Sequence, residues 1–184
     1  MNVFYLDRDP RICAEMHCDK HVCKMIIEYA QLMSTAHRVH DGSVYYDKTK
    51  NGRRIKRWYL NSNMEGILYK ASHVNHPSAQ WARASDGNYK WLYEMWTHLC
   101  EEYTHRYGKV HETQRKLADA LSHIPMNIPK QQFKEPPQAM SHYPDCMVEG
   151  DSIKAYKNYY IVAKKEFAKW TKRQIPEWFQ YAEV

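Results

Sequence analysis

The sequence has no run of apolar residues long enough to cross a membrane. A transmembrane helix needs about 20 mainly apolar residues in succession, and no segment here approaches that length. The first residues, MNVFYLDRDP, also lack the basic and then apolar regions of a secretory leader. Cysteine is scarce, and its odd count of five favours reduced thiols over a disulfide framework. We therefore expect a cytoplasmic protein with no membrane partner.

Several chemical motifs are missing as well. The chain contains no G-x-G-x-x-G sequence, no P-loop and no zinc-ribbon spacing, which argues against the common nucleotide-binding and zinc-ribbon classes. The sequence SIKA, which begins at Ser152, has its lysine one position too early for the S-x-x-K of β-lactamases, and the partner motifs of those enzymes are absent as well. None of these motifs therefore assigns an activity.

Positive charge and aromatic residues are what the composition does contain. The 184 residues carry a formal net charge of +6, and 14% of them are aromatic. Positive charge attracts polyanions, and flat rings between cations suit base stacking. Ordinary helix packing also uses many aromatic residues, so composition leaves a nucleic-acid partner and an unspecialised basic protein both open.

Hydrophobic periodicity predicts a mainly α fold, a compact single domain over residues 1–184 with three to five helices and one small β-hairpin. Asp9 and Pro10 form a helix start. No Gly or Pro interrupts the next 30 residues, so one amphipathic helix of about seven or eight turns is expected there. Asn51-Gly52 predicts the turn of a basic hairpin insertion at about 43–60.

The remaining elements are predicted from similar signals. Residues 2–6 form a short strand or an extended entry. Helices are expected at about 64–71, from Asn88 to Gly108, over 111–122 and over 152–173. Five prolines crowd the segment at about 125–145, which is therefore either an ordered wrap or a flexible loop.

The stretch CAEMHCDKHVCKM, at positions 13–25, lies in the expected first helix. Residues i, i+3, i+4 and i+7 share one helix face, which places His17, Lys20, His21, Lys24 and Glu28 on one polar stripe. Lysine binds phosphate as a point charge, and histidine or glutamate can move protons near neutral pH. The stripe predicts an active-site face with Lys24, His21, His17 and Glu28 as catalytic residues, although a solvated helix face has the same pattern.

A metal site is the alternative for this helix. His17 and His21 are four residues apart, the spacing by which two imidazoles hold one zinc ion. The zincin motif H-E-x-x-H fails at Cys18, which stands where the general-base glutamate should be. A third ligand would come from His73 or His76. We expect no cofactor, with a divalent metal such as zinc on His17, His21 and His76 as the alternative.

Basic side chains cluster at the hairpin tip and along the expected last helix. Each cation near a phosphate releases condensed counterions, which favours DNA binding. The predicted nucleic-acid-binding residues are Lys20, Arg38, Arg53, Arg54, Lys56, Arg57, Arg83, Lys164 and Lys165. A solvated, mobile loop is the competing interpretation of the hairpin charges.

Three pieces of the chain follow one another in a suggestive order. They are CAEMHCDKHVCKM, HPSAQWARASDGNYKWLYEMWTHLCEEYTHRYGK and YKNYYIVAKKEFAKW. In order and residue types they resemble the pyrimidine-dimer DNA glycosylases, the endonuclease V type of phages and bacteria. The resemblance implies a compact helical fold whose N-terminus and first long helix form the active site. It also implies basic side chains that clamp a kinked duplex with one base flipped out.

Two positions depart from that family's pattern. The family's nucleophile is the α-amine of a threonine exposed when the initiator Met is removed, whereas this chain has Asn2, whose bulk ordinarily prevents the removal. The family's essential helix glutamate falls at or beside Lys24, and Glu28 lies one turn further on. Either the register differs, or the scaffold performs another reaction on DNA.

The sequence thus predicts an enzyme that binds double-stranded DNA and processes a flipped-out, modified pyrimidine base. One alternative is a transferase that displaces a phosphorylated leaving group during phage thymine hypermodification, in which case the protein would work in the host cytoplasm. A non-catalytic nucleic-acid-binding protein and a metal-dependent enzyme that uses His17 and His21 are two further possibilities. The oligomeric state is left open.

Overall fold

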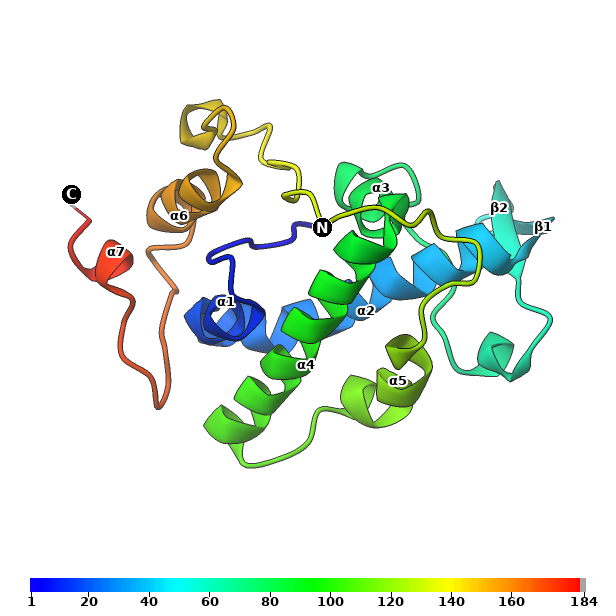
Figure 1. Ribbon diagram of the computed structural model, residues 1–184, viewed down its shortest axis with the longest axis horizontal. Coiled ribbons are helices and arrows are strands. Elements are labelled where there is room, and N and C mark those ends of the chain that lie inside the picture. Colours follow the sequence, from blue (N-terminus) through cyan, green and yellow to red (C-terminus); the bar gives the residue numbers. More distant parts are fainter. Residues whose placement is uncertain (183–184) are drawn as a thin grey trace.

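Helices make up most of the computed structural model, which describes residues 1–182 (Figure 1). The described residues contain seven α-helices, two short 3-10 helices and one two-stranded sheet. In chain order these are α1 (Pro10–Met16), α2 (Asp19–Asp41), β1 (Ser43–Lys48), β2 (Arg54–Tyr59), η1 (Asn63–Gly66), α3 (Pro77–Ala84), α4 (Asp86–Tyr107), α5 (Glu112–Ser122), η2 (Pro144–Cys146), α6 (Ser152–Ala163) and α7 (Glu177–Gln180). The mainly helical prediction is confirmed, but three to five helices was too few. Among residues 1–182, no helix is both long and apolar enough to cross a membrane.

The two long helices, α2 and α4, cross at the centre of the molecule (Figure 1). Both are amphipathic, and their apolar faces share one core, to which Ile26, Met33 and Leu99 contribute fully buried side chains. The indole nitrogen of Trp96 on α4 donates to the Ile26 carbonyl of α2 at 2.9 Å. This bond gives the buried indole N–H a partner and fixes where the helices cross.

The prediction of a single first helix is wrong, because the helix is interrupted after Met16. Asp9 caps α1 through the amides of Arg11 and Ile12, as expected. His17 and Cys18 then take extended backbone angles before α2 begins at Asp19. Neither residue is a helix breaker by itself. The break is held by distant partners: Tyr29 bonds the His17 ring, and the Tyr160 hydroxyl accepts from the Cys18 amide.

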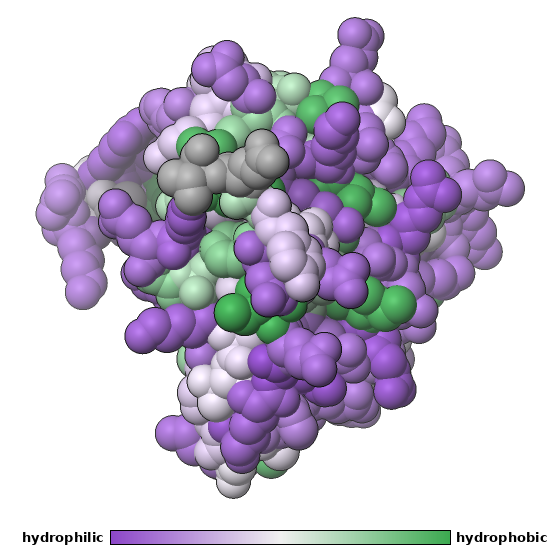
Figure 2. All heavy atoms as spheres, turned by 90° about the vertical axis from the view of Figure 1, so that its left-hand side faces the viewer, coloured by the Kyte–Doolittle hydropathy of each residue, from purple (hydrophilic) through white to green (hydrophobic). Residues whose placement is uncertain are grey.

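The predicted last helix is also too long, because α6 ends at Ala163. Residues 164–175, here called the strap, run back over the junction between α1 and α2. The carboxylate of Asp19 accepts from both the amide and the hydroxyl of Thr171. Arg173 donates twice to the buried carboxylate of Glu102 on α4. These long-range hydrogen bonds take the place of the backbone hydrogen bonds that a longer α6 would have made. On the face that carries α6 and α7, hydrophilic side chains predominate and hydrophobic ones are exposed only in separate patches (Figure 2).

The shorter elements agree with the sequence to different degrees. The hairpin is confirmed, with Tyr46 paired to Lys56 and Gly52 in the left-handed region at φ 75°. Helix α4 ends before Gly108, which is also left-handed, and α5 lies close to its expected limits. The helix expected at 64–71 is only the short η1. Helix α3 was not predicted, although Pro77 occupies its first turn.

The proline-rich segment is an ordered wrap rather than a flexible loop. It runs from α5 past the N-terminal segment to η2 (Figure 1). Its backbone bonds the start of α4, where the Asp86 amide donates to the Pro129 carbonyl at 2.8 Å and the Asp86 carboxylate accepts from the Gln131 amide at 3.0 Å. A Cβ on Gly87 would lie 2.5 Å from the Phe133 nitrogen, so only glycine lets the wrap approach α4 this closely.

Candidate functional site

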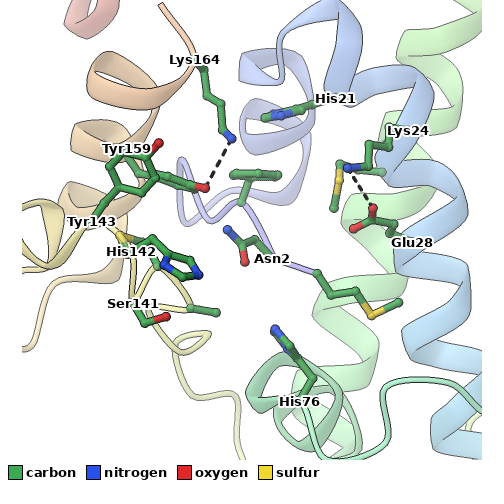
Figure 3. A pocket seen from close by; sticks show the side chains of 15 residues that line it. Asn2, His21, Lys24, Glu28, His76, Ser141, His142, Tyr143, Tyr159 and Lys164 are labelled. Carbon is green, nitrogen blue, oxygen red and sulfur yellow. Dashed lines mark hydrogen bonds and ion pairs between the residues drawn. The ribbon is translucent and has the colours of Figure 1, made fainter.

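A pocket of about 370 Å³ opens between the N-terminal segment, the first half of α2 and the end of α6. Its walls come from the N-terminal segment, α2, the start of α3, the end of the wrap and the end of α6 (Figure 3). The lining residues are Met1, Asn2, Phe4, His21, Lys24, Met25, Glu28, His76, Ala139, Met140, Ser141, His142, Tyr143, Tyr159 and Lys164.

Three of the four predicted catalytic residues line this pocket together. His21, Lys24 and Glu28 lie on successive turns of α2, and the Lys24 ammonium is 3.3 Å from the Glu28 carboxylate. Lys24 and Glu28 face His142 and Tyr143 across the pocket (Figure 3). His21 and Lys164 lie at one end and His76 at the other. The helical spacing of the stripe therefore holds from His21 onward.

His17 does not belong to the pocket, which corrects its place on the stripe. Its side chain is fully buried beneath the N-terminal segment. Nδ1 donates to the Cys13 carbonyl at 2.8 Å, and Nε2 accepts from the Tyr29 hydroxyl at 2.8 Å. Tyr29 in turn accepts from the Phe4 amide. Burial lowers the pKa of His17 to about 4, so it is a neutral structural residue that anchors Phe4.

The alternative metal site is not formed by these residues. Both ring nitrogens of His17 are occupied by protein partners. Nδ1 of His76 accepts from the Ser78 amide and caps α3. In the part of the chain that the structure describes, no three His, Cys, Asp or Glu side chains are grouped to hold a metal ion.

His21 lines the pocket but does not change its charge near neutral pH. The side chain is 5% exposed and stacks on Phe4 with ring centroids 4.2 Å apart. Burial lowers the pKa of His21 to about 2, with further lowering from nearby positive charges that include Lys164 and Lys24. A neutral imidazole in this place can donate one hydrogen bond and accept another. Among the described residues, Glu28 is the one acidic side chain that lines the pocket.

The pocket combines cations with flat aromatic surfaces. Lys164 lies 3.3 Å from the Tyr159 hydroxyl, with its ammonium 4.6 Å from the centre of that ring. The rings of Tyr143 and Tyr159 lie 5.1 Å apart, and Phe4 forms the floor between them and His21. Such a site offers positive charge to an anion and faces for a planar ring to stack on.

Several lining residues had no signal in the sequence. Ser141, His142 and Tyr143 belong to the wrap, which has no periodic pattern. Asn2 reaches the pocket only because Phe4 is anchored through Tyr29. Tyr159 could have been found, since it belongs to the basic and aromatic piece near the C-terminus.

The predicted nucleic-acid-binding residues separate into exposed and buried groups. Arg53, Arg54 and Lys56 are exposed on the hairpin, and Arg54 stacks on Tyr46 at 3.8 Å. Lys20 and Lys165 are also exposed. Lys164 points into the pocket, as described above. Arg57 is half-buried and donates to the Ala71 carbonyl at 2.8 Å, so it supports the hairpin.

Arg38 is buried and bonded within the protein, whereas Arg83 is only half-buried. The side chain of Arg38 is 2% exposed. Its guanidinium donates to the carboxylate and carbonyl of Glu65 and to three further carbonyls, those of Trp58, Leu68 and Tyr69. Arg83 is half-buried, and burial lowers its pKa. Arg38 therefore closes a loop, a role that a pattern of residue types does not reveal.

The pocket is thus a cationic and aromatic site between the N-terminal segment, α2 and the end of α6, with a carboxylate beside a lysine. Comparison of the chain with protein-family models, with curated proteins and with solved structures gives no match.

Proposed function

We propose that the protein is a DNA-acting enzyme that processes a flipped-out, modified pyrimidine base in this pocket. The observation that carries the proposal is the convergence of Lys24, Glu28 and Lys164 with the aromatic rings of Phe4, Tyr143 and Tyr159 in one cavity. These six residues are spread between positions 4 and 164, so the fold has to bring distant parts of the chain together to form the cavity.

Size and lining both support a nucleotide as the occupant. Pockets for small ligands commonly measure ~300–1,000 Å³, and this one is about 370 Å³. Its aromatic rings suit a planar base, and its lysines suit the attached phosphates. A base inside a duplex cannot reach such a cavity, so the nucleotide would have to be extrahelical. Glu28 is the group placed to transfer a proton to or from the substrate.

Transfer chemistry is a second candidate, and the charge of the pocket favours it. Among residues 1–182, two lysines line the cavity against one carboxylate, and Lys24 is 64% exposed although it pairs with Glu28. A surplus of positive charge stabilises an anionic leaving group such as phosphate. The same residues would then hold a phosphorylated pyrimidine while an amine displaces the phosphate.

Borohydride trapping distinguishes the two chemistries. In the glycosylase reaction a pocket amine attacks C1′ of the nucleotide, the base departs and an imine links protein to DNA. Borohydride reduces that imine to a stable adduct. Duplexes that contain either a pyrimidine photodimer or 5-phosphooxymethyluracil should be compared. An adduct on either duplex supports the glycosylase. Loss of phosphate from the second duplex without an adduct, in the presence of a primary amine, supports transfer. If the protein neither changes nor binds either duplex, the proposal is wrong.

The hairpin should provide a DNA contact outside the pocket. We expect the triple change Arg53→Glu, Arg54→Glu and Lys56→Glu to weaken duplex binding strongly. It should also reduce the slope of log K against log salt by roughly 0.9 for each lost phosphate contact. Arg57 is left intact because it bonds the Ala71 carbonyl.

A matched control is available on another surface. Lys109, Arg115 and Lys116 are exposed at the start of α5 and just before it, and their reversal to glutamate changes the net charge by the same amount. Fluorescence anisotropy at several salt concentrations measures both triples. Equal weakening by the two would mean that only overall charge matters and that the hairpin is not a contact.

A further inference from the structure

His21 is held by its neighbours in one tautomer. Its Nδ1 lies 2.6 Å from the Tyr160 hydroxyl. Burial raises the pKa of Tyr160 well above its usual value, so this hydroxyl keeps its proton. The Cys18 thiol competes as an acceptor, but sulfur accepts weakly compared with an imidazole nitrogen. Tyr160 therefore donates to Nδ1, and the proton of the neutral ring is on Nε2.

The ring cannot easily turn to exchange its nitrogens. One face stacks on Phe4 at 4.2 Å, and Tyr160 and Phe167 pack edge-on at 5.1 and 6.0 Å. Nε2 has no hydrogen-bond partner among residues 1–182, although the side chain is only 5% exposed and lines the pocket. This N–H is not among the fully buried polar atoms that lack a partner, so it opens onto the pocket, where a ligand can accept from it.

Positive charge surrounds this donor. Lys24 and Lys164 line the same cavity, and Lys164 lies at the same end as His21 (Figure 3). Lys20 lies outside the pocket with its ammonium 4.4 Å from the Phe167 ring. These cations oppose protonation of His21, so the site offers two mobile charges and one fixed neutral donor. An anionic oxygen is the partner that satisfies all three.

We propose that this end of the pocket is a phosphate subsite in which the Nε2–H of His21 is a fixed donor and Lys24 and Lys164 supply the charge. The carrier of the phosphate, a DNA nucleotide, rests on the proposed function, whereas the subsite itself does not. Bound phosphate competes with Glu28 for Lys24. His21 is then a binding and positioning residue that recognises the substrate without transferring a proton.

Nitrogen-15 NMR of the histidine rings reports the tautomer directly. In the free protein we expect His21 to stay neutral, with its proton on Nε2, from pH 5.5 to 8. The groups that face it are Lys20, Lys24 and His17 around α2, Phe167 in the strap, Lys164 at the end of α6, and Glu28 within the pocket. Addition of inorganic phosphate should move the Nε2–H resonance to lower field. An Nδ1–H tautomer or an imidazolium at pH 7 in the free protein would overturn the proposal.

Substitutions test the contribution to binding. His21→Phe keeps the stacked ring but removes the donor, and we expect it to weaken the binding of inorganic phosphate about tenfold or more. His21→Gln, which retains an N–H at a similar distance, should keep part of the affinity. His37→Phe is the matched control, because His37 is also a buried histidine bonded to a tyrosine, Tyr89 at 2.9 Å, but lies outside this pocket.

Three outcomes separate the subsite from the proposed function. Unchanged phosphate affinity in His21→Phe, or an equal loss in His37→Phe, would overturn the subsite. If His21→Phe does not fold, Tyr160→Phe provides the second variant, because it removes the hydroxyl that holds the His21 ring, and phosphate affinity should fall. Thymidine 5′-monophosphate and a short duplex are titrated in parallel. Phosphate and nucleotide binding without any duplex binding would retain the subsite and contradict the DNA-acting function.

Discussion

The Lys24→Ala variant is expected to lose catalytic turnover by about 10²-fold or more while its melting temperature stays nearly constant. The side chain is 64% exposed, so its ion pair with Glu28 adds little to stability. In the pocket, by contrast, Lys24 joins Lys164 in stabilising negative charge as it develops. Turnover of a modified duplex and thermal unfolding, measured on the same preparation, check both parts of this prediction.

Lys90→Ala is the control for this variant. Lys90 is 58% exposed and pairs with Asp86 one turn away on α4, which reproduces the local setting of Lys24 and Glu28. It has no place in the pocket and should leave turnover unchanged. Intact turnover with a large loss of stability in Lys24→Ala would mean that the lysine is structural. A raised KM with unchanged kcat would mean that Lys24 binds the ground state and the transition state equally.

Arg38→Met should be strongly destabilising. It removes the guanidinium donors that close the loop from Trp58 to Tyr69 and leaves the Glu65 carboxylate without this partner. The pair is only partly buried, with Glu65 28% exposed, but four carbonyls lose their donor as well, so we expect a cost of about 3–5 kcal/mol. For a chain of this size we expect the melting temperature to fall by on the order of 10 °C.

Arg54→Met, at an exposed position of the hairpin, is the comparison for stability. It should change the free energy of unfolding by no more than ~0.5 kcal/mol. Arg38→Met should therefore lower stability and leave DNA affinity unchanged. Arg54→Met should leave stability unchanged and lower DNA affinity. A stable Arg38→Met protein with weakened DNA binding would restore Arg38 to the interface.

Local signals explain which parts of the fold could be predicted. Asp9 with Pro10, Asn51 with Gly52, and Gly108 each determine backbone geometry within a few residues, and each marks a boundary that the structure has. The break after Met16 and the end of α6 depend instead on bonds to residues more than ten positions away. Periodicity contains no information about those partners.

The candidate site likewise has one part that local signals predict and another part that they do not. His21, Lys24 and Glu28 share a face because α2 is regular from Asp19 onward, so helical spacing brought them together correctly. His17 precedes that helix and is turned inward. The opposite wall, with His142 and Tyr143, is placed by irregular backbone whose course no spacing rule describes.

The pocket is built from parts of the chain that are far apart in sequence, and this affects how readily it opens and unfolds. Phe4 and Tyr159 stack across a separation of most of the chain, whereas α2 and α4 contact each other directly along regular helices. Contacts between such distant residues form late during folding, because closing the long loop costs entropy first. Segments with irregular backbone also open at lower free energy than packed helices. Amides of the wrap and of α6 should therefore exchange with solvent before those of α2, and activity should disappear on warming before the helical signal does.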